Sequence, residues 1–357
     1  MEDIKNKMQY VNLGRSGVKV SRLSYGNFAS WTKDADAQTT ANKLIKQAFD
    51  AGINFFDTAE AYADGHAETQ LGIALKELNV PRSDLVISTK IFWGKFDANT
   101  TAINNRGTSR KRLFEGVNGA LERLQLDHVD VVFCHRYDYD TPTIEIVQAF
   151  KDLIASGKVL YWATSTWPVE RVVEAILLAD QIGCPRPIAE QVQYSMLHRH
   201  EVEKDYVALF DSYGYGTTIW SPLKGGLLTG KYNDGVPEGS RFDKFKGWWK
   251  QQTKKGALFS EENKDATVAT LKGLGAIAER LGGSQAQLAL AWTLKLKDVT
   301  TCILGAKNEK QLKENLEALH LVDKITPEVA EEIETLLNNR PVQNTNYQTR
   351  TPLPDRR

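Results

Sequence analysis

The chain has 357 residues, of which 41% are hydrophobic and 25% are charged, a composition typical of globular proteins. Its 45 Lys and Arg residues balance its 45 Asp and Glu residues, so net charge gives no reason to expect binding to nucleic acid or to an anionic membrane. No apolar stretch approaches the roughly 20 residues of a membrane span, and the first ten residues lack the apolar segment of a secretory signal.

The cysteines Cys134, Cys184 and Cys302 are far apart in apolar surroundings and match neither a disulfide framework nor a metal site. We therefore expect a reducing, cytoplasmic compartment and no bound metal. Cys134 precedes His135, but neighbouring residues of a strand point to opposite faces, which argues against a Cys–His nucleophile.

Alternating apolar and polar residues around the "GRSG" at 14–17 predict a β-hairpin near the N-terminus. Amphipathic helices then alternate with short apolar strands. We expect helices at 35–52, 66–78, 108–126, 143–158, 168–183, 201–214, 284–296, 309–319 and 326–340. We expect strands at 53–59, 84–90, 128–135, 159–165, 188–194, 216–223 and 299–305.

This alternation, repeated about eight times, predicts a parallel sheet because each crossover is a helix. A closed (β/α)8 TIM barrel with long βα loops is favoured over an open sheet, and no GxGxxG follows the first strand. Residues 224–264 interrupt the rhythm as a long loop that is either functional or disordered. We expect one domain over 1–357, with its core at about 10–340 and a C-terminal tail at 341–357.

Four polar residues stand where expected strands end, which is where a barrel builds its active site. Asp57, Lys90 and His135 end successive strands, and Tyr62 follows Asp57 by five residues. Singly, Asp57 could cap the next helix, Tyr62 could be a packed aromatic and His135 a structural histidine. A lysine at the end of a buried strand, however, is unusual unless it is paired. Together the four predict a catalytic site.

The chemistry of this set suits proton transfer to a carbonyl oxygen. A nearby lysine favours phenolate and lowers the pKa of tyrosine, while a carboxylate keeps the lysine charged and positioned. Tyr62 would then be a general acid that works near neutral pH, and His135 could hydrogen-bond the same oxygen.

Several blocks resemble the aldo-keto reductases: "NFFDTAEAYADGHAE", "ISTK", "DVVFCHR" and "CILGAKNEKQLKEN". The segments "TKIFWG", "GKVLYWATS" and "WSPLKGGLLTGKY" are most similar to the branch of voltage-gated potassium-channel β subunits. The resemblance covers about residues 10–321. It implies a (β/α)8 barrel that binds nicotinamide dinucleotide without a Rossmann motif and reduces aldehydes or ketones by hydride transfer.

Residue by residue, the resemblance implies that Tyr62 donates the proton, that Asp57 and Lys90 tune it, and that His135 orients the carbonyl. It also implies a cofactor site made of Asp57, Ser165, Gln191, Trp220, Ser221, Pro222, Leu223, Lys224, Lys231, Arg241, Gly305, Lys307, Gln311, Glu314 and Asn315. Lys307 and Arg241 favour NADP(H) over NAD(H), because a 2′-phosphate needs a cationic partner. The chain departs from the family at Gln311, where arginine is frequent.

Aromatic residues in the loops indicate an apolar or aromatic carbonyl substrate, although sugars also stack on aromatic rings. We expect Phe28, Trp31 and Trp93 to contact it beside His135. Trp248 and Trp249 could pack on the barrel or form a lid. A second hypothesis is a regulatory subunit that binds the cytoplasmic domain of a channel. Against it, channel subunits often carry asparagine at the position of His135, and only about ten residues precede the hairpin. A monomer and a homotetramer both remain open.

Overall fold

The computed structural model describes residues 2–28, 36–94, 103–244, 246–354 and 356. By internal contacts the chain divides into two compact units. The first consists of residues 1–193, 205–220 and 298–313, and the second of residues 194–204, 221–297 and 314–357. The expectation of one domain over the whole chain stays a prediction.

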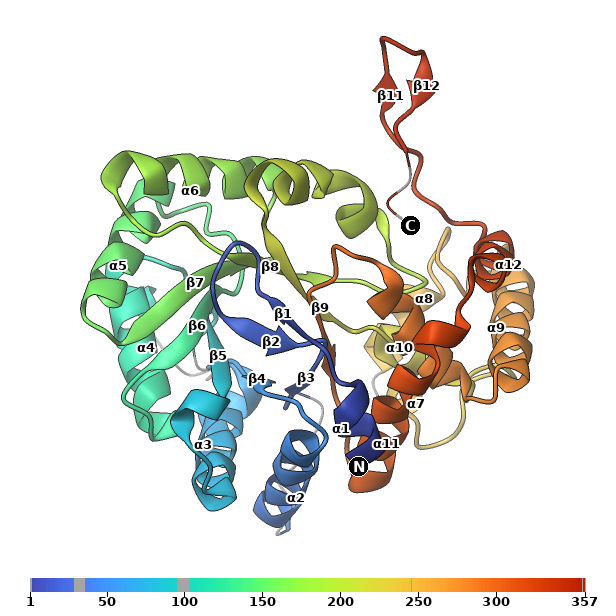
Figure 1. Cartoon of the computed structure of the whole chain (residues 1–357), viewed down its shortest axis with the longest axis horizontal. Helices are drawn as coiled ribbons and strands as arrows, with labels where there is room; N and C mark the ends of the chain where they lie inside the picture. The colour runs from blue at the N-terminus through green and yellow to red at the C-terminus, as the bar shows by residue number, and fades with distance from the viewer. Residues whose placement is uncertain (1, 29–35, 95–102, 245, 355, 357) are drawn as a thin grey trace. The chain divides into compact units, whose positions relative to one another are not determined.

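The first unit contains a closed barrel of eight parallel strands, most of which are labelled in Figure 1. In chain order the strands are β3 (Leu23–Gly26), β4 (Phe55–Asp57), β5 (Val86–Ile91), β6 (Val129–Cys134), β7 (Val159–Ser165), β8 (Ala189–Gln193), β9 (Gly216–Trp220) and β10 (Thr301–Leu304). Each pairs with its neighbour in sequence, and β10 pairs with β3 to close the ring. The predicted barrel is thereby confirmed.

Helices follow the strands of this unit on the outside of the ring: α2 (Ala37–Asp50), α3 (His66–Leu78), α4 (Arg110–Leu124), α5 (Thr143–Ala155) and α6 (Val169–Ile182). Local sequence sets their ends. Ser109 caps α4 by accepting a hydrogen bond from the backbone N–H of Arg112, and Gly183 ends α6 in the left-handed conformation. The short helix α1 (Glu2–Lys7) precedes the hairpin.

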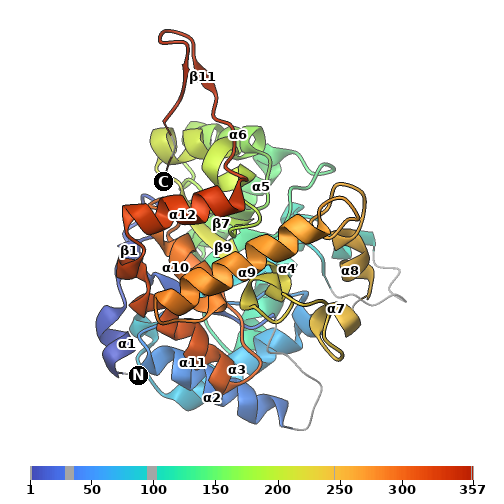
Figure 2. The same cartoon turned by 90° about the vertical axis from the view of Figure 1, so that its right-hand side faces the viewer.

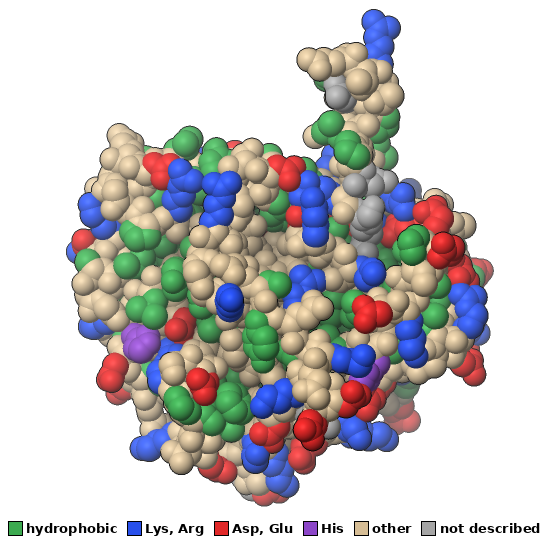
Figure 3. All heavy atoms as spheres, in the orientation of Figure 1, with side chains coloured by type: hydrophobic (Ala, Val, Ile, Leu, Met, Phe, Trp, Pro, Cys, Tyr) green, Lys and Arg blue, Asp and Glu red, His purple; other side chains and the backbone are tan. Residues whose placement is uncertain are grey.

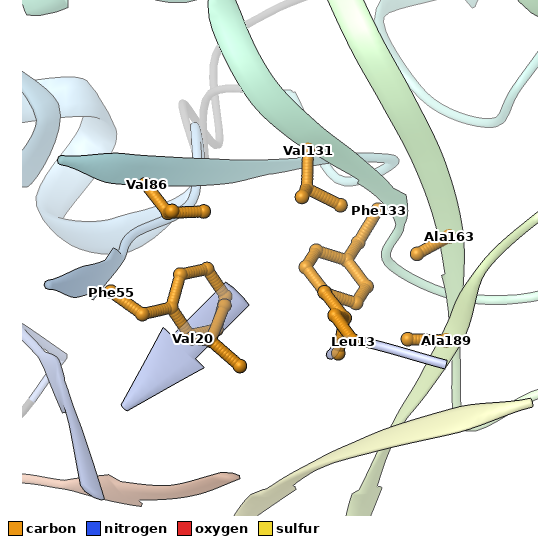
Figure 4. Close-up of a cluster of buried hydrophobic side chains, with 8 residues drawn as sticks. All are labelled: Leu13, Val20, Phe55, Val86, Val131, Phe133, Ala163 and Ala189. Carbon is orange, nitrogen blue, oxygen red and sulfur yellow. The ribbon is translucent and has the colours of Figure 1, made fainter. Parts of the chain in front are cut away.

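The predicted hairpin is present as β1 (Tyr10–Asn12) and β2 (Lys19–Ser21). Leu13 and Val20, from this hairpin and the residue after its first strand, pack against Phe55 and Val86, the first residues of β4 and β5, and against other side chains of the barrel interior, as Figure 4 shows. Gly14 makes this approach possible: its φ is +60°, and a Cβ there would lie 2.3 Å from the carbonyl oxygen of Ile188. The hairpin therefore plugs the amino end of the barrel and leaves the carboxyl end for a site.

The second unit is mainly helical, with α7 (Arg241–Lys244), α8 (Lys246–Gln252), α9 (Lys264–Arg280), α10 (Gln285–Lys295) and α12 (Pro327–Leu337). Helix α11 (Glu309–Leu316) spans the boundary between the units. Figure 2 shows α9 and α12 side by side, where Arg280 bonds Glu332. The expected long loop at 224–264 contains short helices, and the expected tail holds the hairpin β11 (Thr345–Asn346) and β12 (Thr351–Pro352).

A buried ion network links separate segments of this second unit. Arg199 donates to Glu203 at 2.7 Å and to Glu334 at 2.7 Å, with all three side chains almost completely buried. Its guanidinium also lies 5.1 Å from the ring centroid of Trp292. Because Glu334 belongs to α12, the network ties the segment after β8 to the last helix.

Two surface properties bear on function. No helix of the described residues is long and apolar enough to cross a bilayer. On the face shown in Figure 3, basic and acidic side chains are interspersed, in keeping with the zero net charge.

Candidate active site

The barrel brings together the four residues that the sequence singled out at its strand ends. Asp57 ends β4, Lys90 lies near the end of β5 and His135 follows β6. Tyr62 begins a short 3-10 turn, Tyr62–Gly65, in the loop after β4. The inward-pointing residues of each strand alternate with outward ones, so Asp57, Lys90 and His135 share the side of Phe55 and Phe133, which line the barrel interior. All four residues belong to the first unit.

Asp57 and Lys90 form a buried ion pair. The Lys90 ammonium donates to Asp57 Oδ2 at 2.5 Å and to the carbonyl oxygen of Thr58 at 2.6 Å. The other oxygen of Asp57 accepts from the Ser88 hydroxyl at 2.7 Å and from the Gln191 amide at 3.2 Å. With these partners Asp57 does not cap a helix, so that alternative is wrong.

The Tyr62 ring lies next to the ammonium group of this pair. The Lys90 ammonium is 4.8 Å from the centroid of the Tyr62 ring, and the Tyr62 and His135 rings meet edge to face with centroids 6.0 Å apart. Burial raises the pKa of Tyr62, and the positive charge of Lys90 opposes that rise without cancelling it. The expected lowering of this pKa is therefore wrong in direction: desolvation of the phenolate outweighs the charge of Lys90.

The charges of the other two groups are also determined by burial and neighbours. Burial disfavours the charged form of Lys90, but the Asp57 carboxylate and Tyr62 overcome it and raise its pKa above the ordinary value. Burial lowers the pKa of His135 well below the ordinary value, and the cations Lys90 and Arg136 lower it further. At neutral pH the site thus presents a protonated phenol, a charged ammonium and a neutral imidazole. His135 Nδ1 is buried and has no hydrogen-bond partner among the described residues.

Aromatic rings flank the site. The Phe28 ring meets Tyr62 edge to face at 4.9 Å, and the Trp93 ring meets His135 at 6.4 Å. Two of the expected substrate contacts therefore lie beside the polar cluster. Trp31 lies outside the described residues, as does the side chain of Trp248.

The expected cofactor residues of the first unit lie on or after strands β7 to β10. Ser165 ends β7 and Gln191 is the middle residue of β8; the Ser165 hydroxyl donates to the Gln191 carbonyl at 3.0 Å, and the Gln191 amide donates to Asp57 at 3.2 Å. Trp220 ends β9 half-buried. Gly305 and Lys307 follow β10, and the Gln311 side chain accepts from the backbone N–H of Lys307 at 3.0 Å.

In the second unit, the segment Ser221–Lys231 contains several residues with positive φ. Ser221 and Lys224 have positive φ values of 53° and 48°, which are uncommon for residues other than glycine and are typical of functional sites. Gly225, Gly226 and Gly230 also have positive φ. Burial lowers the pKa of Lys224. The remaining expected contacts in this unit are Pro222, Leu223, Arg241, Glu314 and Asn315, of which Pro222 and Asn315 are buried.

The site depends on residues that sequence reasoning missed. Ser88 and Thr58 hold the Asp57–Lys90 pair in place. Arg136 donates to the carbonyl oxygen of His135 at 2.5 Å, and its charge acts on Tyr62. Ser88 could have been found from its position two residues before Lys90, since alternate residues of a strand share a face. Arg136 directly follows His135 in a loop expected to shape the pocket, but its effect on Tyr62 was not predicted, and the role of Thr58 has no local signal in the sequence.

Comparison with known proteins gives a consistent result. The model of the Aldo/keto reductase family matches residues 22–338. A Schizosaccharomyces pombe protein is 45% identical over 332 residues, which cover 93% of this chain and 94% of that protein. Proteins of Oryza sativa and Arabidopsis thaliana are 42% and 41% identical over 343 residues, each covering 95% of this chain and 100% of the relative. All three relatives are named, in each case provisionally, as voltage-gated potassium channel subunit beta.

Proposed function

The chain belongs to the aldo/keto reductase family, and we propose that it reduces aldehydes or ketones to alcohols with NADPH. Membership of this family supports an oxidoreductase role with NAD(P)H. The observation that carries this proposal is the cluster of Asp57, Tyr62, Lys90 and His135 at the carboxyl end of the barrel. A nicotinamide dinucleotide, when bound, would supply the hydride for the carbonyl carbon.

Tyr62 is the proton donor in this proposal. Its raised pKa keeps the phenol protonated at neutral pH, and it gives its proton to the carbonyl oxygen as the alkoxide forms. The Lys90 ammonium stabilises the phenolate left behind, and Asp57 keeps that ammonium in place. Neutral His135 orients the carbonyl oxygen by a hydrogen bond, and Phe28 and Trp93 contact the substrate.

The residues available suit a nicotinamide dinucleotide. Ser165 and Gln191 offer a hydroxyl and an amide for the carboxamide, and Trp220 offers a ring for stacking. In the second unit, the positive-φ backbone from Ser221 to Gly230, with Lys224 and Lys231, suits a pyrophosphate. We propose that Lys307 and Arg241 favour NADP(H), because the 2′-phosphate requires cationic partners. Further contacts proposed are Pro222, Leu223, Gly305, Gln311, Glu314 and Asn315.

The test is turnover of NADPH with an activated aromatic aldehyde, followed by loss of NADPH absorbance. Tyr62→Phe should lower kcat about 10²- to 10⁴-fold, because it removes the general acid and little else. Tyr161→Phe is the matched control, since Tyr161 packs against the barrel core away from the site. Equal rates for Tyr62→Phe and the parent would contradict the role of Tyr62.

A second candidate function is binding to a potassium channel, which the names of the relatives favour. In that case the protein would bind the cytoplasmic domain of a channel, in the cytoplasm and as a homotetramer. Pull-down of such a domain at near-physiological salt tests the binding, and light scattering tests the oligomeric state. His135 favours the enzyme, because it adds a hydrogen-bonding group beside Tyr62.

A further inference from the structure

A buried carboxylate holds the wall of the candidate active site that carries Trp93. Glu60, two residues before Tyr62, is only 4% exposed. Its Oε1 accepts hydrogen bonds from the backbone N–H groups of Phe92, at 2.9 Å, and Gly94, at 3.0 Å. These two residues flank Trp93, so one carboxylate oxygen fixes the backbone on both sides of that ring.

Arg112 extends this contact to the other end of the same connection. This α4 residue is 5% exposed and forms an ion pair with Glu60 Oε2. Its Nε donates to the carbonyl oxygen of Asn105 at 3.1 Å, and the N–H of Gly107 donates to the carbonyl oxygen of Phe92 at 2.8 Å. The pair therefore contacts both the segment after β5, at Phe92 and Gly94, and the segment before α4, at Asn105.

Glu60 also belongs to the segment that carries the proposed acid. Its backbone N–H donates to the carbonyl oxygen of Lys90 at 3.3 Å, and the N–H of Tyr62 donates to the carbonyl oxygen of Ala59 at 3.0 Å. The Trp93 ring lies edge to face with the rings of His135 and Phe92, with centroid distances of 6.4 Å and 4.8 Å. The carboxylate thus fixes the distance between the Tyr62 segment and the Trp93 segment.

Joining two segments by a buried ion pair has a high desolvation cost. Desolvation of a buried ion pair can cost as much as the attraction returns, and an apolar pair of the same size is often as stable. What the ion pair adds here is direction, because one carboxylate satisfies two backbone donors and one guanidinium at fixed angles. Such a device suits positioning better than stabilisation.

We propose that the Glu60–Arg112 pair is a specificity-determining element that positions Trp93 against His135 and so selects flat aromatic carbonyl substrates. The proposal rests on the proposed reductase function. Glu60 and Arg112 act as positioning residues, through Trp93, and take no part in the proton transfer.

The kinetic test compares Arg112→Met with the parent on an activated aromatic aldehyde and on a small aliphatic aldehyde, both with saturating NADPH. The variant should raise KM for the aromatic aldehyde about tenfold or more, because Trp93 no longer has a fixed position. The kcat for both substrates and KM for the aliphatic aldehyde should stay within about threefold of the parent. Arg112→Lys keeps the charge but not the fork of donors, so it should restore part of the aromatic preference.

The chain offers a matched control in Arg123→Met. Arg123 of α4 pairs at 2.6 Å with Glu68 of α3, whose carboxylate is fully buried and also bonds Thr89. Within the described part of the chain, Glu68 accepts from Arg123 and Thr89, whereas the backbone N–H groups of Phe92 and Gly94 donate to Glu60. Arg123→Met should lower Tm as Arg112→Met does, but should leave the ratio of the two KM values unchanged. Equal changes of that ratio in both variants, or no change in Arg112→Met, would overturn the proposal.

Hydrogen exchange tests the same contact without catalysis. The amides of Phe92 and Gly94 should exchange faster in Arg112→Met than in the parent, and at the parent rate in Arg123→Met. If the parent reduces no aldehyde, the proposed function fails while this measurement still reports on the pair. Unchanged exchange of both amides in Arg112→Met would overturn the positioning role.

Discussion

The ammonium of Lys90 lies 2.5 Å from the carboxylate of Asp57 inside the barrel, with 0% and 4% of the two side chains exposed. Neither charge could stay there alone, because an isolated ion in a protein interior costs several kcal/mol. Ser88, Thr58 and Gln191 complete the hydrogen bonds of the pair. The pair is thus a fixed dipole next to the Tyr62 ring.

Breaking this pair should cost both stability and activity. Lys90→Met leaves the Asp57 carboxylate buried without its counterion, so the free energy of unfolding should fall by about 3–5 kcal/mol. The double variant Asp57→Asn/Lys90→Met removes both charges and should recover part of that stability, but no turnover. Urea unfolding and NADPH turnover measure the two effects. Lys46→Met is the control, because the exposed Lys46–Asp50 pair should contribute less than about 1 kcal/mol.

His135 should make the protein less stable in mild acid. Its folded-state pKa is well below 6.5 because of burial, so below about pH 6.5 the unfolded chain binds a proton that the folded chain does not. The free energy of unfolding should therefore fall as pH decreases through that region. His135→Asn should reduce this loss, as measured by urea unfolding between about pH 5 and pH 8.

The exposed residue His66 provides the comparison for this measurement. The difference in unfolding free energy between His135→Asn and the parent should grow as pH falls, beyond any change in His66→Asn. A difference that is independent of pH would show that His135 is not held neutral by burial.

Glu190 should have the opposite pH dependence. This β8 residue is fully buried, accepts from the Thr164 hydroxyl at 2.5 Å, and burial raises its pKa to about 8. Between about pH 4.5 and pH 8 the folded chain holds a proton that the unfolded chain has lost, so stability should fall as pH rises. Glu190→Gln should remove that fall, which could reach about 5 kcal/mol.

Unfolding of Glu190→Gln and of the parent at about pH 6 and pH 9 measures this difference. Glu170→Gln, at an exposed position of α6, is the control and should follow the parent. Parallel pH profiles of Glu190→Gln and the parent would argue against a protonated Glu190.

The hairpin plug should contribute to the stability of the barrel unit. Leu13 is fully buried among Phe133, Ala163 and Ala189, as Figure 4 shows. Leu13→Ala leaves a cavity there and should lower the free energy of unfolding by about 3–5 kcal/mol. Leu177→Ala, at a site that is 56% exposed, should change it by less than about 1 kcal/mol. Equal effects of the two substitutions would contradict the plug.

The sequence by itself predicted the elements whose pattern is local. Strand β6 is buried throughout and ends in the apolar run Val131–Cys134, and caps such as Ser109 act within one turn of their helix. The position of Asp57, Lys90 and His135 at strand ends was also visible, because parallel strands place those ends at one edge of the barrel. The family resemblance added the assignment of roles, which remain proposals.

Tertiary structure alone decided what depends on residues far apart in the chain. Gln191 bonds Asp57, 134 residues away in the sequence, and Arg112 bonds Glu60, 52 residues away. The pattern of apolar and polar residues predicts neither contact. The pKa of Tyr62 is likewise raised by burial. The sequence places Lys90 near Tyr62 but does not show how deeply Tyr62 is buried, so it cannot tell which of the two effects on the pKa is larger. Local patterns determine where strands and helices form, but long-range packing determines the dielectric environment and the partners of each charged group.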